Sequence, residues 1–114
     1  MREDGKIDYI EWPATDLSAT KGFYTKAFGW AFTDYGPDYA AFADQGADGG
    51  FTTPQEGSTD KPLVVLYAHD IEAMADKVTA AGGVITKPIF SFPGGRRFHF
   101  TDPSGNELAV WSEG

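Results

Sequence analysis

The sequence predicts an α+β fold made of two tandem βαβββ modules. Short stretches alternate between apolar and polar residues, as half-buried strands do. Two helical stretches each follow an aspartate suited to cap a helix. The second half also repeats the first: at an offset of 54, residues 16–29 and 70–83 share five identities and one conservative match over fourteen positions. We therefore expect both halves to have the same fold.

The residue pattern of the first half predicts one strand, then one helix, then three further strands. Residues 6–12 alternate as a strand that Pro13 ends, and Asp16 is placed to cap a helix that stops at Gly29. The apolar stripe of this helix is expected at Phe23, Tyr24, Ala27 and Phe28. Turn-forming residues then separate three short stretches with strand character, at 30–35, 39–44 and 49–53.

The second half predicts the same order. Residues 63–68 are a strand, and Asp70 caps a helix that ends at Gly82–Gly83, with its apolar stripe at Ile71, Met74, Ala75 and Val78. An extended stretch at 84–92 and a final hairpin follow. We expect one domain over residues 1–114, with module 1 at about 6–54, a polar linker at about 55–62 and module 2 at about 63–113.

The final hairpin, residues 97–111, has two unlike faces. Asp102-Pro103-Ser104-Gly105 has turn chemistry, because proline presets φ and glycine accepts positive φ. Alternation places an apolar set on one face: Phe98, Phe100, Leu108 and Val110. The other face receives Arg97, His99, Glu107, Ala109 and Trp111. A sheet with this mixed second face indicates a ligand-binding surface.

Composition excludes several functions. The net charge of −8 argues against nucleic acid and anionic membranes as partners, and it would favour a cationic ligand. The absence of cysteine excludes disulfides, thiolate catalysis and cysteine–zinc sites. The opening residues do not predict a signal peptide, and the longest apolar run, 63–68, is too short to cross a bilayer. We expect a cytoplasmic protein.

Three motifs, in this order, resemble the vicinal oxygen chelate superfamily, which includes glyoxalase I, extradiol dioxygenases and bleomycin-resistance proteins. They are Glu11-Trp-Pro-Ala-Thr-Asp-Leu17, Phe23-Tyr-Thr-Lys-Ala-Phe-Gly-Trp30, and Asp102-Pro-Ser-Gly-Asn106 with Trp111. The match spans nearly the whole chain and is most similar to small glyoxalase-like proteins. It implies a curved mixed β-sheet around a cavity, with the helices on the outer face.

The resemblance also implies four metal-ligand positions, on the first and last strand of each module. Three of them are Tyr9, Leu63 and Ala109, and the fourth lies in the stretch 49–53, which has no His, Glu or Asp. Leucine and alanine cannot bind a metal, and a phenol does so rarely. We therefore predict no metal site and no cofactor.

Strand parity places Glu11 with Tyr9, and Arg97 with His99, on the expected cavity face. The aromatic candidates are expected to line an apolar pocket that stacks planar ligands. Glu11 and His99 are the candidate catalytic acid–base residues. The candidate ligand-binding residues are Tyr9, Phe51, Tyr67, Arg97, Glu107 and Trp111. A structural role stays open for each: Glu11 as a carboxylate bonded to amides or an arginine, His99 as an ordinary hydrogen-bonded histidine, and the aromatics as core.

These residues support three functional hypotheses. The first is a metal-independent small-molecule-binding protein, similar to the bleomycin-resistance branch, acting as a homodimer on a cationic or aromatic ligand. The second is a metal-independent lyase or isomerase that uses Glu11 and His99 for proton transfer. The third is a subunit or interaction partner whose cavity has collapsed.

Overall fold

The computed structural model describes residues 2–54 and 60–114. The chain divides into two compact units, a first unit of residues 9–63 and a second unit of residues 64–114 together with residues 2–8. Most of the predicted linker, residues 55–59, lies outside the described residues.

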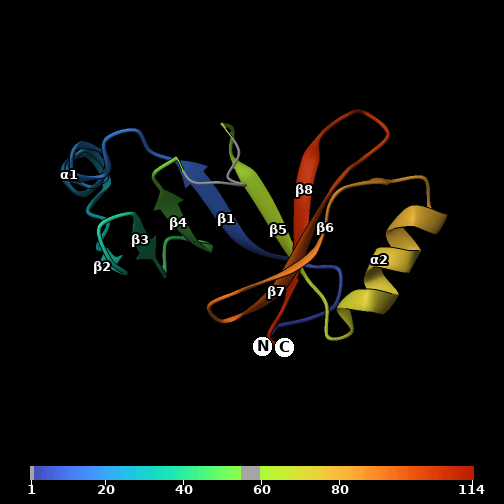
Figure 1. Ribbon diagram of the computed structural model, residues 1–114. Coiled ribbons are helices and arrows are strands. Elements are labelled where there is room, and N and C mark those ends of the chain that lie inside the picture. Colours follow the sequence, from blue (N-terminus) through green and yellow to red (C-terminus); the bar gives the residue numbers. More distant parts are fainter. Residues whose placement is uncertain (1, 55–59) are drawn as a thin grey trace. The chain divides into compact units, whose positions relative to one another are not determined.

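The first unit contains four strands and one helix (Figure 1). In chain order they are β1 (Ile7–Pro13), α1 (Leu17–Phe28), β2 (Thr33–Asp34), β3 (Tyr39–Phe42) and β4 (Asp48–Thr52). The strand order is β2-β3-β4-β1, with β1 parallel to β4. Strand β2 is shorter than the predicted stretch 30–35, and Trp30 instead packs its ring on Tyr24, with the ring centres 4.8 Å apart.

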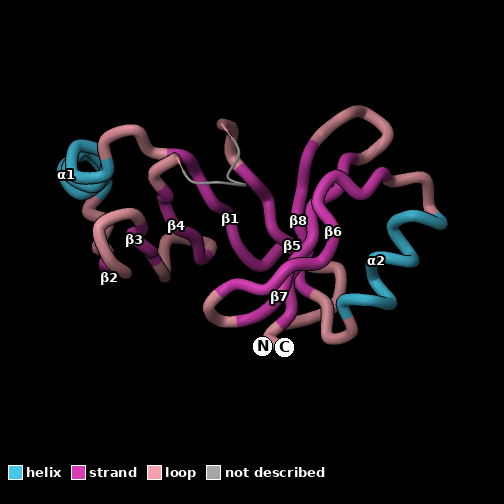
Figure 2. Tube along the Cα trace, viewed as in Figure 1, coloured by secondary structure: helices cyan, strands magenta, loops and turns pink. Residues whose placement is uncertain are grey.

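The second unit repeats this order (Figure 2). It contains β5 (Leu63–Tyr67), α2 (Ile71–Ala80), β6 (Val84–Phe92), β7 (Gly95–Thr101) and β8 (Glu107–Ser112). The strand order is β5-β8-β7-β6, and β5 runs parallel to β8. In each unit the first strand therefore pairs with the last one. The predicted fold class, α+β with tandem βαβββ modules, is confirmed.

Both helices begin at the predicted aspartates. The Asp16 carboxylate accepts a hydrogen bond from the Ala19 backbone N–H at 3.0 Å, and Asp70 accepts one from Ala73 at 3.1 Å. Such caps satisfy N–H groups that have no partner within the helix. Gly29 ends α1 at φ 74°, a left-handed conformation that glycine adopts without strain.

Helix α2 packs on the apolar face of the β7–β8 hairpin. Ile71 and Phe98 are fully buried there, and Met74, Ala75 and Val78 pack against the same cluster. The predicted stripe of α2 and the apolar face of the hairpin are thus confirmed. The turn is confirmed too: Asp102 accepts hydrogen bonds from the backbone N–H groups of Ser104 and Asn106, both at 2.9 Å, and Gly105 has φ 83°.

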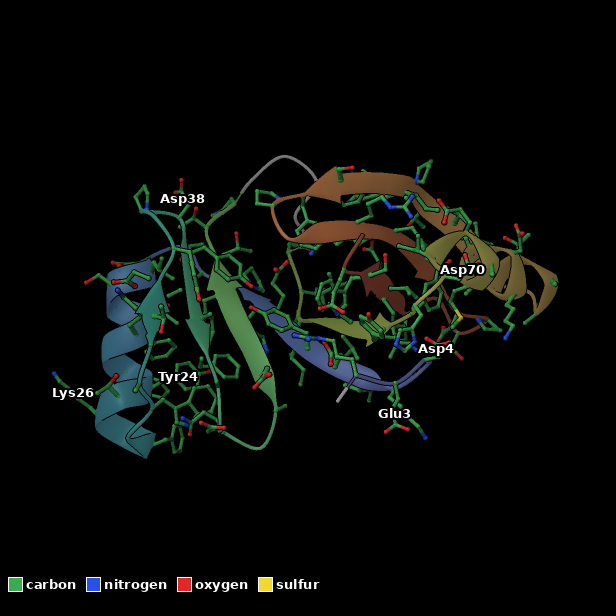
Figure 3. The ribbon with its side chains drawn as sticks, turned by 90° about the horizontal axis from the view of Figure 1, so that it is seen from below. Glu3, Asp4, Tyr24, Lys26, Asp38 and Asp70 are labelled. Atoms are coloured by element: carbon green, nitrogen blue, oxygen red, sulfur yellow. The ribbon has the colours of Figure 1, made fainter. Side chains whose placement is uncertain are left out.

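Helix α1 is less buried than its sequence predicts. Tyr24 points toward the strands and contacts Phe51, whereas Lys26 points away from them (Figure 3). Phe23 and Phe28, expected in the same apolar stripe, are 57% and 63% exposed. Only part of that stripe therefore contributes to the core of the first unit. Among the described residues, neither helix is long and apolar enough to span a membrane.

Candidate functional site

The mixed face of the β7–β8 hairpin is the centre of the candidate site in the second unit. The register pairs Arg97 with Trp111, and His99 with Ala109. Paired residues of neighbouring strands point to the same side of a sheet, so these side chains share one face. Tyr67 of β5 pairs with Trp111 and belongs to this face as well. The structure therefore brings together five of the predicted site residues: Tyr67, Arg97, His99, Glu107 and Trp111.

His99 is fully buried and is oriented by a carboxylate. Its Nδ1 lies 3.1 Å from Glu107 Oε2. Because a carboxylate accepts hydrogen bonds, Nδ1 carries the proton and Nε2 keeps a free lone pair. Burial, with a smaller contribution from the positive charge of Arg97, lowers the pKa of His99 to about 4. The imidazole is therefore neutral at neutral pH.

The second nitrogen of His99 is the unusual feature of this face. Nε2 is buried and has no hydrogen-bond partner within residues 2–54 and 60–114. A buried polar atom without a partner costs about 1–3 kcal/mol. Most such atoms in folded proteins are satisfied, so each exception needs a reason.

Arg97 lies beside His99 and is flanked by two aromatic rings. Its guanidinium carbon lies 5.5 Å from the ring centre of Phe90 and 5.7 Å from that of Phe92. Both distances suit cation–π contacts, which hold a guanidinium in place. The sequence missed Phe90 and Phe92, because two register shifts in β6 break the simple alternation there.

Tyr67 and Trp111 are each held by a carboxylate that the sequence did not indicate. Tyr67 Oη donates to Glu113 Oε1 at 2.8 Å, and Trp111 Nε1 donates to Asp8 Oδ2 at 2.9 Å. The two rings meet edge to face, with their centres 5.4 Å apart. The hydrogen bond to Glu113 raises the pKa of Tyr67, so the phenol stays protonated.

The first unit carries a second group of polar residues. Tyr39 Oη donates to Glu11 Oε2 at 3.1 Å and lies 2.5 Å from Tyr9 Oη. Since Tyr39 donates to Glu11, Tyr9 is the donor in the shorter bond. Burial raises the pKa values of both phenols, which are therefore protonated donors. The structure thus links the predicted residues Tyr9 and Glu11 through Tyr39, which the sequence did not single out.

A glycine makes room for this chain of hydrogen bonds. Gly50 pairs with Glu11 on β1 and with Ala41 on β3. A Cβ atom at Gly50 would lie 2.6 Å from Tyr39 Cζ and 2.7 Å from Cε1, closer than real side chains approach. The Tyr39 ring therefore lies directly over the backbone of Gly50.

Phe51 lies on the opposite face of its strands from Tyr9 and Glu11. It pairs with Trp12, and their rings stack with centres 5.3 Å apart. Alternation along β1 puts Trp12 on the opposite face from Tyr9 and Glu11. Phe51 is 3% exposed in the aromatic core under α1. The structure thus gives Phe51 the core role that the sequence left open for the aromatic candidates.

The implied metal positions hold no divalent-metal donor set. Leu63 and Ala109 are buried apolar side chains, and the Tyr9 phenol is engaged with Tyr39. Among the described residues, no three His, Asp or Glu side chains come together in a way that suits a metal ion. The donors present do not fit the metal that the resemblance implies.

A groove of about 480 Å³ lies between α1 and the end of β1, with Trp12, Phe23 and Tyr24 in its wall. No sequence pattern indicated this groove. Two of the polar side chains in its wall, Asp16 and Thr20, make hydrogen bonds that start α1. Among the described residues, none of the buried polar atoms that lack a hydrogen-bond partner belongs to a residue of its wall.

Fold and site define a tandem βαβββ protein with a mixed polar and aromatic face on the strands of its second unit. The chain belongs to the Glyoxalase/Bleomycin resistance protein/Dioxygenase superfamily, whose sequence model matches residues 6–110. The family resemblance inferred from the three motifs is thereby confirmed.

Curated relatives are about twice as long as this chain. The chain is similar to CFP32 of Mycobacterium tuberculosis, a protein named as a glyoxylase, with 28% identity over 94% of this chain and 45% of the relative. It is also similar to the anthracycline biosynthesis protein DauV of a Streptomyces species, with 31% identity over 96% of this chain and 48% of the relative. The chain thus spans about half the length of the curated relatives it matches.

Solved structures share the fold. Methylmalonyl-CoA epimerase from Mycobacterium tuberculosis has a TM-score of 0.78 at 14% identity, over 100% of this chain and 91% of that one. The Mn(II)-bound glyoxalase from Novosphingobium aromaticivorans has a TM-score of 0.69 at 23% identity, over 99% of this chain and 40% of that one.

Proposed function

We propose that this chain binds a small molecule on the mixed face of its second unit, without a resident divalent metal. The observation that carries the proposal is the buried His99 Nε2, which has no partner in the described part of the chain. It lies beside Arg97, a fixed cation. An acceptor and a donor kept side by side on one face are suited to a polar group of a ligand.

The chemistry of this face defines what the ligand needs. Arg97 is a strong charge-assisted donor, and neutral His99 is an acceptor. Trp111 adds aromatic surface that can stack on a planar or apolar part of the ligand, and the buried Tyr67 packs edge to face against it. The net charge of −8 favours a ligand with a positive charge elsewhere in the molecule. Apolar contact supplies affinity here, and the polar pair sets orientation.

We propose metal independence because of the side chains at the implied metal-ligand positions. Three of the four implied positions are Tyr9, Leu63 and Ala109, and two of these have no metal-binding atom in their side chains. We also propose that the chain acts as a cytoplasmic homodimer, as the bleomycin-resistance branch would imply, and that it binds neither nucleic acid nor membranes. Sedimentation at micromolar concentration tests the dimer.

The experiment combines elemental analysis with a thermal-shift screen of metabolites and cationic antibiotics. A ligand from the screen should lose at least about tenfold in affinity in Arg97→Gln, since a charge-assisted contact is worth about 1.5–3 kcal/mol. Arg96→Gln is the matched control, because Arg96 pairs with Glu72 on α2. Equal affinity in both variants would contradict the assigned face. Stoichiometric zinc, nickel, iron or manganese in the purified protein would overturn metal independence.

A second candidate function is a metal-independent lyase or isomerase. The oriented His99–Glu107 pair favours it, because a fixed Nδ1–H leaves Nε2 as a base. In the first unit, the Tyr9–Tyr39–Glu11 chain supplies a carboxylate with a defined proton donor. Activity on any substrate should fall sharply in Glu11→Gln or His99→Ala, with a shifted pH–rate profile. Full activity in the double variant would exclude this assignment.

A further inference from the structure

Two carboxylates and an aromatic ring of the second unit converge on the side chain of Arg2. The guanidinium carbon of Arg2 lies 5.0 Å from the ring centre of Trp111. Its Nε lies 3.3 Å from Asp8 Oδ2, and its Nη1 lies 3.6 Å from Glu113 Oε2. One guanidinium cation therefore contacts an aromatic face and two negative charges at once, an arrangement that recognises organic cations.

The groups around Arg2 are positioned by bonds that do not involve Arg2. Trp111 Nε1 donates to Asp8 Oδ2, and Tyr67 Oη donates to Glu113 Oε1. The Tyr67 and Trp111 rings also pack edge to face. Each carboxylate is thus anchored to an aromatic side chain of the sheet. Because these contacts do not include Arg2, we expect the site to keep its shape when Arg2 leaves.

Arg2 itself is held loosely. Its side chain is 45% exposed, that of Glu113 is 60% exposed, and the 3.6 Å separation between them is too long for a good hydrogen bond. Water competes strongly for ion pairs of this kind. The rest of the segment before β1 has its own contacts, because Asp4 pairs with His69 and the Gly5 N–H donates to the Tyr67 carbonyl. The two side chains labelled there in Figure 3, Glu3 and Asp4, point in different directions.

We propose that Asp8, Tyr67, Trp111 and Glu113 form a binding site for the guanidinium group of a small molecule, and that Arg2 occupies this site as an intramolecular competitor. The proposal deepens the proposed function, on which it rests, because Tyr67 and Trp111 belong to the same ligand-binding face. It names a guanidinium because that is the group the site holds in this structure. Arg2 then sets the ligand concentration at which the site fills.

The competition has a measurable consequence. A ligand that must displace Arg2 binds with an apparent affinity reduced by the fraction of molecules in which the site is open. Removing the competitor with Arg2→Gln should therefore tighten binding of ethylguanidinium by about three- to tenfold. Lys6→Gln is the matched control, since it removes a positive charge from the same segment but not from the site.

The readout is the indole N–H signal of Trp111 in ¹H–¹⁵N spectra, assigned by its loss in Trp111→Phe. This N–H donates to Asp8, so it reports directly on the site. Ethylguanidinium chloride is titrated against sodium chloride at equal ionic strength. In Arg2→Gln the signal should shift at lower ethylguanidinium concentrations than in wild type. The gain should disappear when Glu113→Gln or Asp8→Asn is added.

Equal titration midpoints in wild type, Lys6→Gln and Arg2→Gln would overturn the proposal. The proposal would also be overturned if Arg2→Gln lowered the melting temperature and its Trp111 signal did not shift with ethylguanidinium. Arg2 would then only stabilise the fold. The result is separable from the proposed function. A screen that finds no ligand for Arg97 and His99 does not alter the Trp111 readout.

Discussion

Replacing Gly50 by alanine should break the hydrogen-bond chain of the first unit. The new Cβ would lie 2.6 Å from Tyr39 Cζ, so the ring must move away from Glu11 and Tyr9. Overpacking of this kind costs typically about 1–3 kcal/mol. Two hydrogen bonds of Tyr39 are lost with it, at about 0.5–1.5 kcal/mol each. We expect Gly50→Ala to lower the free energy of unfolding by about 2–6 kcal/mol.

The assay is urea unfolding followed by circular dichroism, with a double-mutant cycle. Leucine at position 39 lacks the ring atoms that the new Cβ would contact. In the Tyr39→Leu background, Gly50→Ala should therefore lower the free energy of unfolding by less than about 1 kcal/mol. Gly22→Ala is the matched control. Gly22 lies in α1 with nothing within 4 Å of an added Cβ, so alanine there should stabilise the protein by about 0.5–1 kcal/mol.

Two results would refute this reasoning. The first is a Gly50→Ala protein within about 0.5 kcal/mol of wild type, the range typical of substitutions that disturb nothing. The second is an equal cost in the wild-type and Tyr39→Leu backgrounds, which would mean that the strain arises somewhere other than the Tyr39 ring.

Three further predictions concern the second unit and the surface of α1. Burial holds the pKa of His99 at about 4 in the folded protein, below its unfolded value near 6.5. Between these pH values the unfolded chain binds more protons than the folded chain does. The free energy of unfolding should therefore fall as the pH falls from about 6.5 to about 4. His99→Gln should remove this part of the pH dependence in urea titrations, and an unchanged profile would contradict the assignment. Phe98→Ala removes a fully buried side chain and should lower the free energy of unfolding by about 3–5 kcal/mol. Phe23→Ala removes a side chain that is 57% exposed, so in the same assay the free energy of unfolding should stay within about 0.5 kcal/mol of wild type. Asp70→Ala should cost about 1 kcal/mol by removing the cap of α2, while Asp70→Ser should retain most of the stability.

Local patterns were sufficient to predict the elements and one face of the site. Asp16 and Asp70 cap their helices as expected, because capping is decided within a few residues. Alternation placed His99 and Phe98 on opposite faces of the hairpin, and the burial of Phe98 under α2 confirms it. Helix caps and strand alternation depend on residues that are close together in the chain, so local sequence patterns predict them.

Features that depend on register between distant strands were missed. The sequence left open whether Phe51 lines a pocket or belongs to the core, because nothing in its own strand reveals that it pairs with Trp12. Tyr39 was overlooked because its bond to Glu11 spans 28 positions and requires the gap left by Gly50. The bond between Asp8 and Trp111 spans 103 positions, which no local pattern can indicate.

The pairing of the first strand with the last strand also constrains when each unit can fold during translation. Val65 pairs with Ala109, which is translated 44 residues later, and Tyr9 pairs with Asp48, 39 residues later. While a ribosome extends the chain, the first strand of each unit has no partner along this edge until the last strand emerges. Contacts of such long sequence separation slow folding and leave an unpaired edge exposed for longer. A nascent chain halted before residue 107 should therefore remain sensitive to proteases across β5, and one released after residue 112 should become resistant.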